Sequence, residues 1–125
     1  MLSHPSVGVF LTHSGWNSVI ESISFGIAMP GWPYFVDQFL NCRFVKDVWK
    51  IGMDFEGVVV DEYRLVSREE VEKGVRRIME CEEARQRVLK LKEVTVKAVS
   101  SGGSSFRNLN KFIQDITRIA ISVKG

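Results

Sequence analysis

The stretch VGVFLTHSGWNSVIESISFG, residues 7–26, decides the fold class. It opens with the continuous apolar run Val7 to Leu11, whose lack of polar alternation is typical of a strand buried on both faces of a parallel sheet. From Asn17 to Phe25 the apolar residues recur at helical spacing, and Gly26 stands where a left-handed residue would end a helix. A buried strand followed at once by a helix predicts one unit of an α/β fold.

The residues that follow repeat this order. Ile27 to Met29 is a second short apolar run, which Pro30 and Pro33 end. A helix is expected from Asp37 to Lys50. Its expected core-facing stripe is Leu40, Phe44, Val48 and Ile51. Strand, helix, strand and helix in this order are typical of a doubly wound parallel sheet.

A weak third strand is expected around Met53 to Glu56, and the rest of the chain is predicted to be helical. Ser67 to Glu70 has the S-x-x-E pattern of a capping box that opens a helix. A second helix is expected from about Glu82 to Val99, and the polar run Ser100 to Ser104 is a hinge before a last helix. The apolar residues of that last helix that we expect to face a core are Leu109, Phe112, Ile113, Ile116 and Ile119.

Composition excludes several classes of protein. The 125 residues are 45% hydrophobic and 26% charged, with a formal net charge of only +2, and the basic residues alternate with glutamates. We therefore expect no nucleic-acid partner, because such a surface needs a stripe of one sign. No apolar run approaches the ~18 residues of a membrane span, so no membrane insertion is expected. Cys42 and Cys81 lack metal-type spacing and are interpreted as free thiols of a reducing, cytoplasmic compartment.

The turn between the first strand and the first helix carries the groups of an anion site. A helix N-terminus presents unpaired N–H groups and about half a positive charge. Gly15 allows a close approach of backbone to a ligand, while Asn17, Ser18 and His13 can donate hydrogen bonds to it. These groups favour a phosphate or diphosphate. The alternative for His13 is a structural histidine that is satisfied within the protein.

Glu21 extends this site along the helix. It follows Asn17 by four residues and Ser18 by three, so it lies on the same helix face one turn further on. A carboxylate there suits two vicinal hydroxyls, and phosphate plus diol is the layout of a ribonucleoside diphosphate. The alternative is a solvated helix residue. The glycine patterns of dinucleotide and P-loop sites are absent, and Ser14 lacks a G-x-S-x-G elbow, so those classes of site lose their support.

The segment PGWPYFVDQ, residues 30–38, predicts a second part of the site. It follows the second strand, at the end of the sheet where open α/β folds bind ligands. Asp37 and Gln38 offer acceptors and donors for several hydroxyls, as a hexose requires. The alternative makes Asp37 a helix N-cap and leaves Gln38 merely exposed.

These residues together resemble the signature box of the plant family 1 UDP-glycosyltransferases. The match covers residues 2–38 in order and spacing, and Asn108, Leu109, Phe112 and Ile113 are similar to the family's C-terminal helix. The matching positions of the box are Leu2, His4, Phe10, His13, Gly15, Trp16, Asn17, Ser18, Glu21, Gly26, Trp32, Pro33, Asp37 and Gln38.

The resemblance implies an α/β chain of the GT-B fold, in which a Rossmann-like C-terminal domain holds the sugar nucleotide. Residues 1–62 would be the second half of that domain, with a parallel sheet, and residues 63–125 a C-terminal helical segment. His13, Asn17 and Ser18 would bind the diphosphate and Glu21 the ribose. The residues that would face the transferred sugar are Trp16, Asp37 and Gln38. The implied donor substrate is a UDP-sugar, with glucose favoured by the final Gln, and no cofactor or metal is implied.

Some family features are changed or missing. Ser14 stands where many members have cysteine, and Ala28 and Pro30 depart from the usual residues of their loop. The family's uracil-stacking tryptophan and its catalytic histidine are not in this chain, and His4 is interpreted as a turn residue. The chain therefore resembles the last portion of an inverting enzyme that glycosylates a small lipophilic acceptor, which the missing N-terminal domain would hold. The alternatives are a non-catalytic chain that binds UDP weakly, an interaction module, or another phosphate-binding α/β protein such as a sugar-phosphate isomerase.

Overall fold

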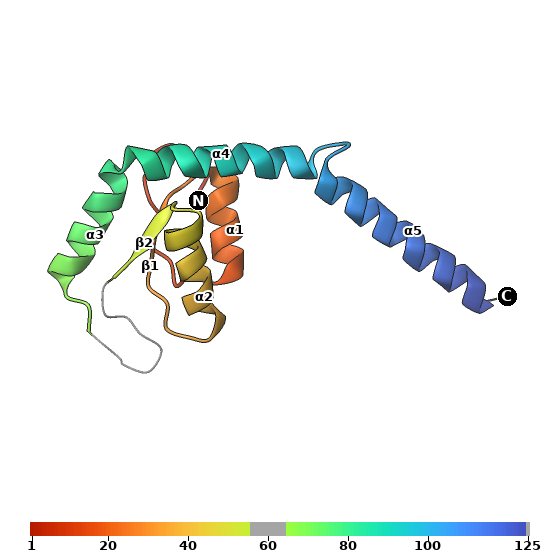
Figure 1. Cartoon of the computed structure of the whole chain (residues 1–125), viewed down its shortest axis with the longest axis horizontal. Helices are drawn as coiled ribbons and strands as arrows, with labels where there is room; N and C mark the ends of the chain where they lie inside the picture. Colours follow the sequence, from red (N-terminus) through yellow and green to blue (C-terminus); the bar gives the residue numbers. More distant parts are fainter. Residues whose placement is uncertain (56–64, 125) are drawn as a thin grey trace. The chain divides into compact units, whose positions relative to one another are not determined.

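The structure, a computed structural model, describes residues 1–55 and 65–124 (Figure 1). It divides into two compact units, Met1–Lys92 and Glu93–Gly125. The predicted domain division at residues 62 and 63 lies outside the described residues. The elements in chain order are α1 (Trp16–Phe25), β1 (Met29–Gly31), α2 (Asp37–Arg43), the π-helical turn η1 (Phe44–Val48), β2 (Gly52–Asp54), α3 (Arg68–Glu80), α4 (Glu82–Val99) and α5 (Ser104–Lys124).

A short parallel sheet is the centre of the first unit. β1 pairs with β2, with Met29 opposite Gly52 and Gly31 opposite Asp54. This confirms the predicted α/β class, although β1 begins later than the predicted apolar run. β2 confirms the weak third strand at residues 52–54, while its predicted end at residue 56 lies outside the described residues.

The predicted strand Val7 to Leu11 runs beside β1 but is joined to it only by isolated bridges, at Val9–Ala28 and Thr12–Gly31. Pro30 explains the interruption. The prediction that Pro30 ends the second strand was wrong, because Pro30 lies inside β1. The Pro30 carbonyl accepts a hydrogen bond from the Thr12 N–H at 3.1 Å. Proline has no N–H, so Pro30 cannot donate a hydrogen bond to the earlier residues of that segment.

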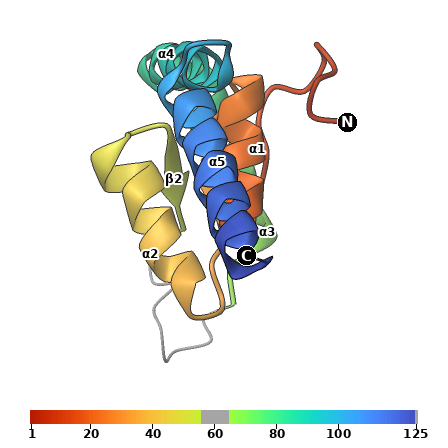
Figure 2. The same cartoon turned by 90° about the vertical axis from the view of Figure 1, so that its right-hand side faces the viewer.

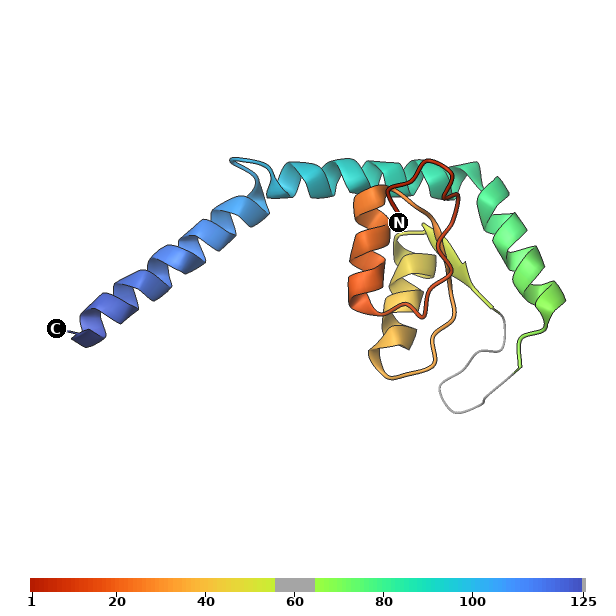
Figure 3. The same ribbon diagram turned by 180° about the vertical axis from the view of Figure 1, so that it is seen from behind.

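The helices cover the sheet on two sides. Figures 1 and 3 show α3 on one side of the strands and α1 with α2 on the other. The nine buried apolar residues that form one cluster between these layers are Val19, Ile23, Ala28, Met29, Val45, Ile51, Ile78, Ala84 and Val88. They come from both sides of the sheet, which is the packing expected of an α/β layer structure.

α1 ends as the sequence predicts. Gly26 has φ 74° and its N–H donates to the carbonyls of Ser22 and Ile23, which is the left-handed ending that glycine favours. The Lys92 Nζ donates to the Phe25 carbonyl at 3.3 Å, so α4 places a positive charge at the C-terminal end of α1.

The predicted helix from Asp37 to Lys50 differs in its second half, and the prediction of a core-facing stripe was wrong for three of its four residues. After α2 the chain makes the π-helical turn η1, in which the Trp49 N–H donates to the Phe44 carbonyl at 2.9 Å. Leu40 and Val48 are 59% and 60% exposed, and Phe44 is also exposed. The side chains that face the core are Gln38, Cys42 and Val45, and the turn then returns Ile51 to the interior.

The C-terminal helices begin close to the predicted residues. Ser67 and Glu70 form the capping box at the start of α3, with the Glu70 N–H donating to the Ser67 Oγ at 3.2 Å. α4 has the predicted bounds. In the second unit, α5 carries the predicted apolar stripe, but all five of its residues are exposed, so the prediction that they face a core was wrong. Nothing else within residues 93–124 covers that stripe.

Among the described helices, none combines the length and apolar content needed to cross a bilayer.

His4 has the turn role that the sequence predicts, because its Nδ1 accepts from the Ser6 N–H at 3.2 Å.

Candidate functional site

The predicted site residues lie at one end of the first unit. The segment that ends at Thr12 and the strand β1 leave the sheet in the same direction, and α1 and α2 both start from that end (Figures 1 and 2). Carboxyl ends of parallel strands are the usual ligand-binding edge of an open α/β sheet. The fold therefore brings both predicted parts of the site to one edge.

A strained turn joins Thr12 to α1. Ser14 has φ 64°, a left-handed conformation that is uncommon for residues other than glycine. The Ser14 N–H donates to the Thr12 Oγ1 at 3.2 Å, while the Ser14 Oγ is fully buried without a hydrogen-bond partner among the described residues. The backbone N–H groups from Gly15 to Ser18 have no partner within residues 1–55 and 65–124 either. The start of α1 therefore has several backbone donors without a partner among the described residues.

The imidazole of His13 lies directly against Gly15. A Cβ atom at residue 15 would overlap with the His13 Nε2. His13 is exposed, and its side chain makes no hydrogen bond within the described part of the chain. No contact within the described residues gives His13 the role of a satisfied structural histidine. Imidazole and free amides converge at the N-terminus of α1, where the helix dipole also favours an anion.

The other predicted residues of α1 have different surroundings. Asn17 and Glu21 are exposed on the helix, and Ser18 is half-buried. Glu21 makes no ion pair among the described residues. The ring of Trp16 packs against Trp49, the residue that follows η1, with ring centroids 6.4 Å apart.

Asp37 and Gln38 do not have the structural roles that the sequence left open as the alternative to sugar binding. The N-cap of α2 is Val36, so Asp37 is the first helical residue and not the cap. Gln38 is only 8% exposed, and its Oε1 accepts from the N–H groups of Tyr34 and Phe35, each at 3.1 Å. The loop before α2 is thus closed by Gln38, whose amide nitrogen has no partner among the described residues.

Asn41 connects the two parts of the site, and sequence reasoning missed it. From α2, its Nδ2 donates to the Ser14 carbonyl at 3.1 Å and to the Asp37 Oδ2 at 3.0 Å. The four-residue spacing from Asp37 was a usable signal for the second bond. The first bond spans 27 residues and has no local signal.

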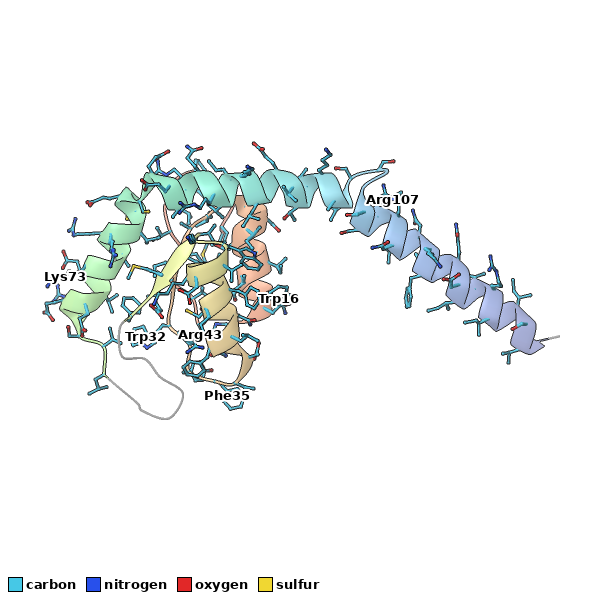
Figure 4. All side chains as sticks on the ribbon, viewed as in Figure 1. Trp16, Trp32, Phe35, Arg43, Lys73 and Arg107 are labelled. Atoms are coloured by element: carbon cyan, nitrogen blue, oxygen red, sulfur yellow. The ribbon has the colours of Figure 1, made fainter. Side chains whose placement is uncertain are left out.

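An open hollow of about 410 Å³ lies beside His13. Its remaining lining residues are Leu11, Thr12, Trp32 and Tyr34, which the sequence analysis did not assign to the site. Figure 4 shows Trp32 near the end of the strands and Phe35 in the loop before α2. The Trp32 ring packs against Phe55 at 5.6 Å between centroids. The hollow therefore has an aromatic wall and a histidine at its edge.

A second hollow of about 560 Å³ lies elsewhere in the first unit and contains none of the predicted site residues. Its basic lining residues are Lys46, Lys50, Lys73, Arg77 and Arg87, and its acidic ones are Asp54 and Glu70. Lys46 forms an ion pair with Asp54 at 2.6 Å, and this partner raises the pKa of the lysine. This surface is a second place where an anion could bind.

Both cysteines are free thiols, as predicted. Cys42 lies buried against Gly31 together with Ser14. Burial raises the pKa of the Cys42 thiol, and the neighbouring Ser14 hydroxyl opposes this with a smaller effect. Within the described residues, no group of three or more His, Cys, Asp or Glu side chains could hold a metal ion.

Comparison with known proteins decides the family. Residues 1–97 match the sequence model described as UDP-glucoronosyl and UDP-glucosyl transferase. The chain belongs to this family of UDP-glycosyltransferases. Its relatives include the 7-deoxyloganetic acid glucosyltransferase of Catharanthus roseus, which is 44% identical over 123 residues, covering 97% of this chain and 24% of the relative. UDP-glycosyltransferase 85A8 of Stevia rebaudiana is 44% identical over 119 residues, covering 93% of this chain and 23% of that protein.

Solved structures of plant family members have the same fold as this chain. Glycyrrhiza uralensis UGT73P12, complexed with glycyrrhetinic acid 3-O-monoglucuronide, has a TM-score of 0.88 at 35% identity, over 97% of this chain and 26% of that one. Medicago truncatula UGT71G1, complexed with UDP-glucose, has a TM-score of 0.86 at 35% identity, over 93% and 25% of the two chains. The predicted resemblance to GT-B glycosyltransferases is confirmed, and the chain spans about a quarter of the length of these relatives.

Proposed function

We propose that this chain forms the nucleotide-sugar site of a UDP-dependent glycosyltransferase, with UDP-glucose as donor. The observation that carries the proposal is the position of the His13 imidazole against Gly15, beside the unpaired N–H groups that open α1. A diphosphate is the ligand that these donors and the helix dipole suit best. The UDP-glucose complex of the Medicago relative supports the choice of nucleotide.

The predicted polar and charged residues then have roles in holding the donor. His13, with Asn17 and Ser18, would bind the diphosphate, and Glu21 would accept from the two ribose hydroxyls. Asp37 would accept hydrogen bonds from the sugar. Gln38 would donate to the sugar through its amide nitrogen, because its Oε1 already closes the loop before α2.

The chemistry of the whole enzyme needs groups that these 125 residues do not supply. The acceptor hydroxyl would lose its proton to a base outside the chain. Its oxygen would then bond to the anomeric carbon as the bond from that carbon to the diphosphate oxygen breaks, with inversion. Negative charge grows on the leaving UDP, and His13 and the α1 N–H groups would stabilise it. No metal is required by this scheme, so a chelator should leave the rate unchanged.

A chimera tests the proposal. We would join this chain to the N-terminal three quarters of the Catharanthus roseus 7-deoxyloganetic acid glucosyltransferase and assay glucose transfer from UDP-glucose to that relative's acceptor. Transfer is expected, and His13→Ala should lower it by about tenfold to a hundredfold, because a charge-assisted hydrogen bond is lost. The matched control is His4→Ala, which removes a histidine from a turn. Equal activity of the two variants would contradict the proposal.

The second candidate is binding without transfer. The chain covers only 24% of the Catharanthus relative, and the acceptor site is expected in the remainder. The isolated chain should therefore bind UDP weakly and form no glucosylated acceptor from UDP-glucose. Product formation by the purified chain alone would rule out this second candidate.

A further inference from the structure

Asn41 lies between the two predicted parts of the site without belonging to either. Its Nδ2 has two hydrogens, and each has an acceptor: the Ser14 carbonyl at 3.1 Å and the Asp37 Oδ2 at 3.0 Å. Both partners are oxygens that can only accept. The amide orientation is therefore fixed by its neighbours, because the opposite orientation would place oxygen against oxygen.

The bond to Ser14 has a consequence for its neighbour. The peptide between Ser14 and Gly15 is planar and trans, so the Gly15 N–H points away from the Ser14 carbonyl. The Asn41 hydrogen bond that fixes the Ser14 carbonyl therefore also fixes the direction of the Gly15 N–H. This matters at Ser14 because its φ of 64° is a conformation that a serine rarely keeps without support.

The bond to Asp37 holds the Asn41 amide in place from the other side. The two residues are one turn apart on α2, and the carboxylate is a charged acceptor, which makes the hydrogen bond stronger than one between neutral groups. Hydrogen bonds in a chain also polarise one another. Asp37, Asn41 and the Ser14–Gly15 peptide thus form one connected series from α2 to the start of α1.

We infer that Asn41 is a positioning residue that couples Asp37 to the Gly15 N–H, and so couples the sugar end of the donor site to its diphosphate end. The inference rests on the proposed function for the identity of the two ends. Its distinctive consequence is that Asp37, which is expected to touch the sugar, also affects binding of UDP, which has no sugar to touch. A separate sugar contact at Asp37 would leave UDP binding unchanged.

Spectra of the ligand-free 125-residue chain give the first test. Asn41→Ala and Asp37→Ala should each shift the Gly15 amide resonance in a nitrogen–proton correlation spectrum. Asn110→Ala, an exposed asparagine of α5, should leave it in place. If Asn41→Ala does not fold, Asn41→Asp keeps the shape and removes the donor, and should shift the same resonance. An unmoved Gly15 resonance in the folded variants would overturn the inference.

UDP titrations of the same proteins give the second test. Each single variant should weaken UDP binding by about threefold to tenfold, because one hydrogen bond in the series is lost. The double variant should be no weaker than Asn41→Ala alone, since Asp37 acts on UDP only through Asn41. Additive losses would overturn the coupling. A parent chain that does not bind UDP would count against the proposed function, while the Gly15 shift would still test the role of Asn41.

Discussion

The His13 Nε2 lies so close to Gly15 that any side chain at residue 15 would overlap with it. The imidazole therefore lies at the start of α1, where the first N–H groups of the helix have no partner within the described residues. Gly15 is required here for the space that a Cβ would fill, since its φ of −62° and ψ of 145° are open to any residue. At residue 15, glycine is therefore needed for the position of His13 and not for the backbone conformation.

Gly15→Ala tests that relationship directly. The added Cβ should displace the imidazole without straining the backbone, so UDP binding should weaken by about tenfold while the unfolding midpoint changes little. Gly8→Ala is the matched control, because a Cβ there would meet Met79 at an ordinary contact of 3.5 Å. Calorimetric titration with UDP and urea unfolding measure the two effects. Unchanged UDP affinity in Gly15→Ala would show that His13 does not hold the nucleotide.

Glu21→Ala should weaken binding of UDP through the ribose. We expect about a tenfold loss of affinity, since two hydrogen bonds to a carboxylate are removed. The analogue 2′,3′-dideoxyuridine diphosphate lacks both ribose hydroxyls, so it should bind to the variant and to the parent chain with equal affinity. Glu80→Ala, which alters an exposed glutamate of α3, is the control. A loss of the same size for both nucleotides would reject the ribose role.

Ile51 and Leu40 test the burial pattern around η1. Ile51 is fully buried, so Ile51→Ala should lower the free energy of unfolding by about 2–5 kcal/mol. Leu40 is 59% exposed, and Leu40→Ala should change that free energy by no more than about 0.5 kcal/mol. Urea unfolding of the 125-residue chain gives both values. Equal losses of unfolding free energy in the two variants would support the continuous helix that the sequence predicted.

The two thiols should differ in reactivity. Alkylation needs the thiolate, and burial of Cys42 raises its pKa, so less thiolate forms at a given pH in the folded chain than in the unfolded one. Iodoacetamide at pH 8 should therefore label half-buried Cys81 first and reach Cys42 only after urea is added. Peptide mapping by mass spectrometry identifies the labelled residue. Rapid labelling of Cys42 without urea would show that the sheet edge around Gly31 is open.

Much of the fold and site was predictable because the relevant interactions are local. His13 and Gly15 lie in the turn before α1, and the spacing of Glu21 from Asn17 and Ser18 placed these three on one helix face. The capping box of Ser67 and Glu70 likewise depends on residues three apart. Such features can be deduced from order and spacing.

The features that sequence reasoning missed depend on pairing or on turns that change the period. The π-helical turn η1 alters the helical repeat, so periodicity pointed to Leu40 in place of Val45 as a core residue. Pro30 is tolerated in β1 because the neighbouring residues of β1 make the hydrogen bonds to β2. This could not be predicted without knowing which strands pair. The Asn41 contact with Ser14 joins residues far apart in the chain, and no local pattern predicts it.

The most direct test of the account is a crystal structure of this chain grown with UDP. The diphosphate is expected within hydrogen-bonding distance of the His13 Nε2 and the Gly15 to Ser18 N–H groups, with Glu21 at the ribose. The basic hollow that Lys73 and Arg77 help to line is the competing place for an anion. Nucleotide bound there, with the start of α1 unoccupied, would contradict the assignment of His13 and the α1 N–H groups to the diphosphate.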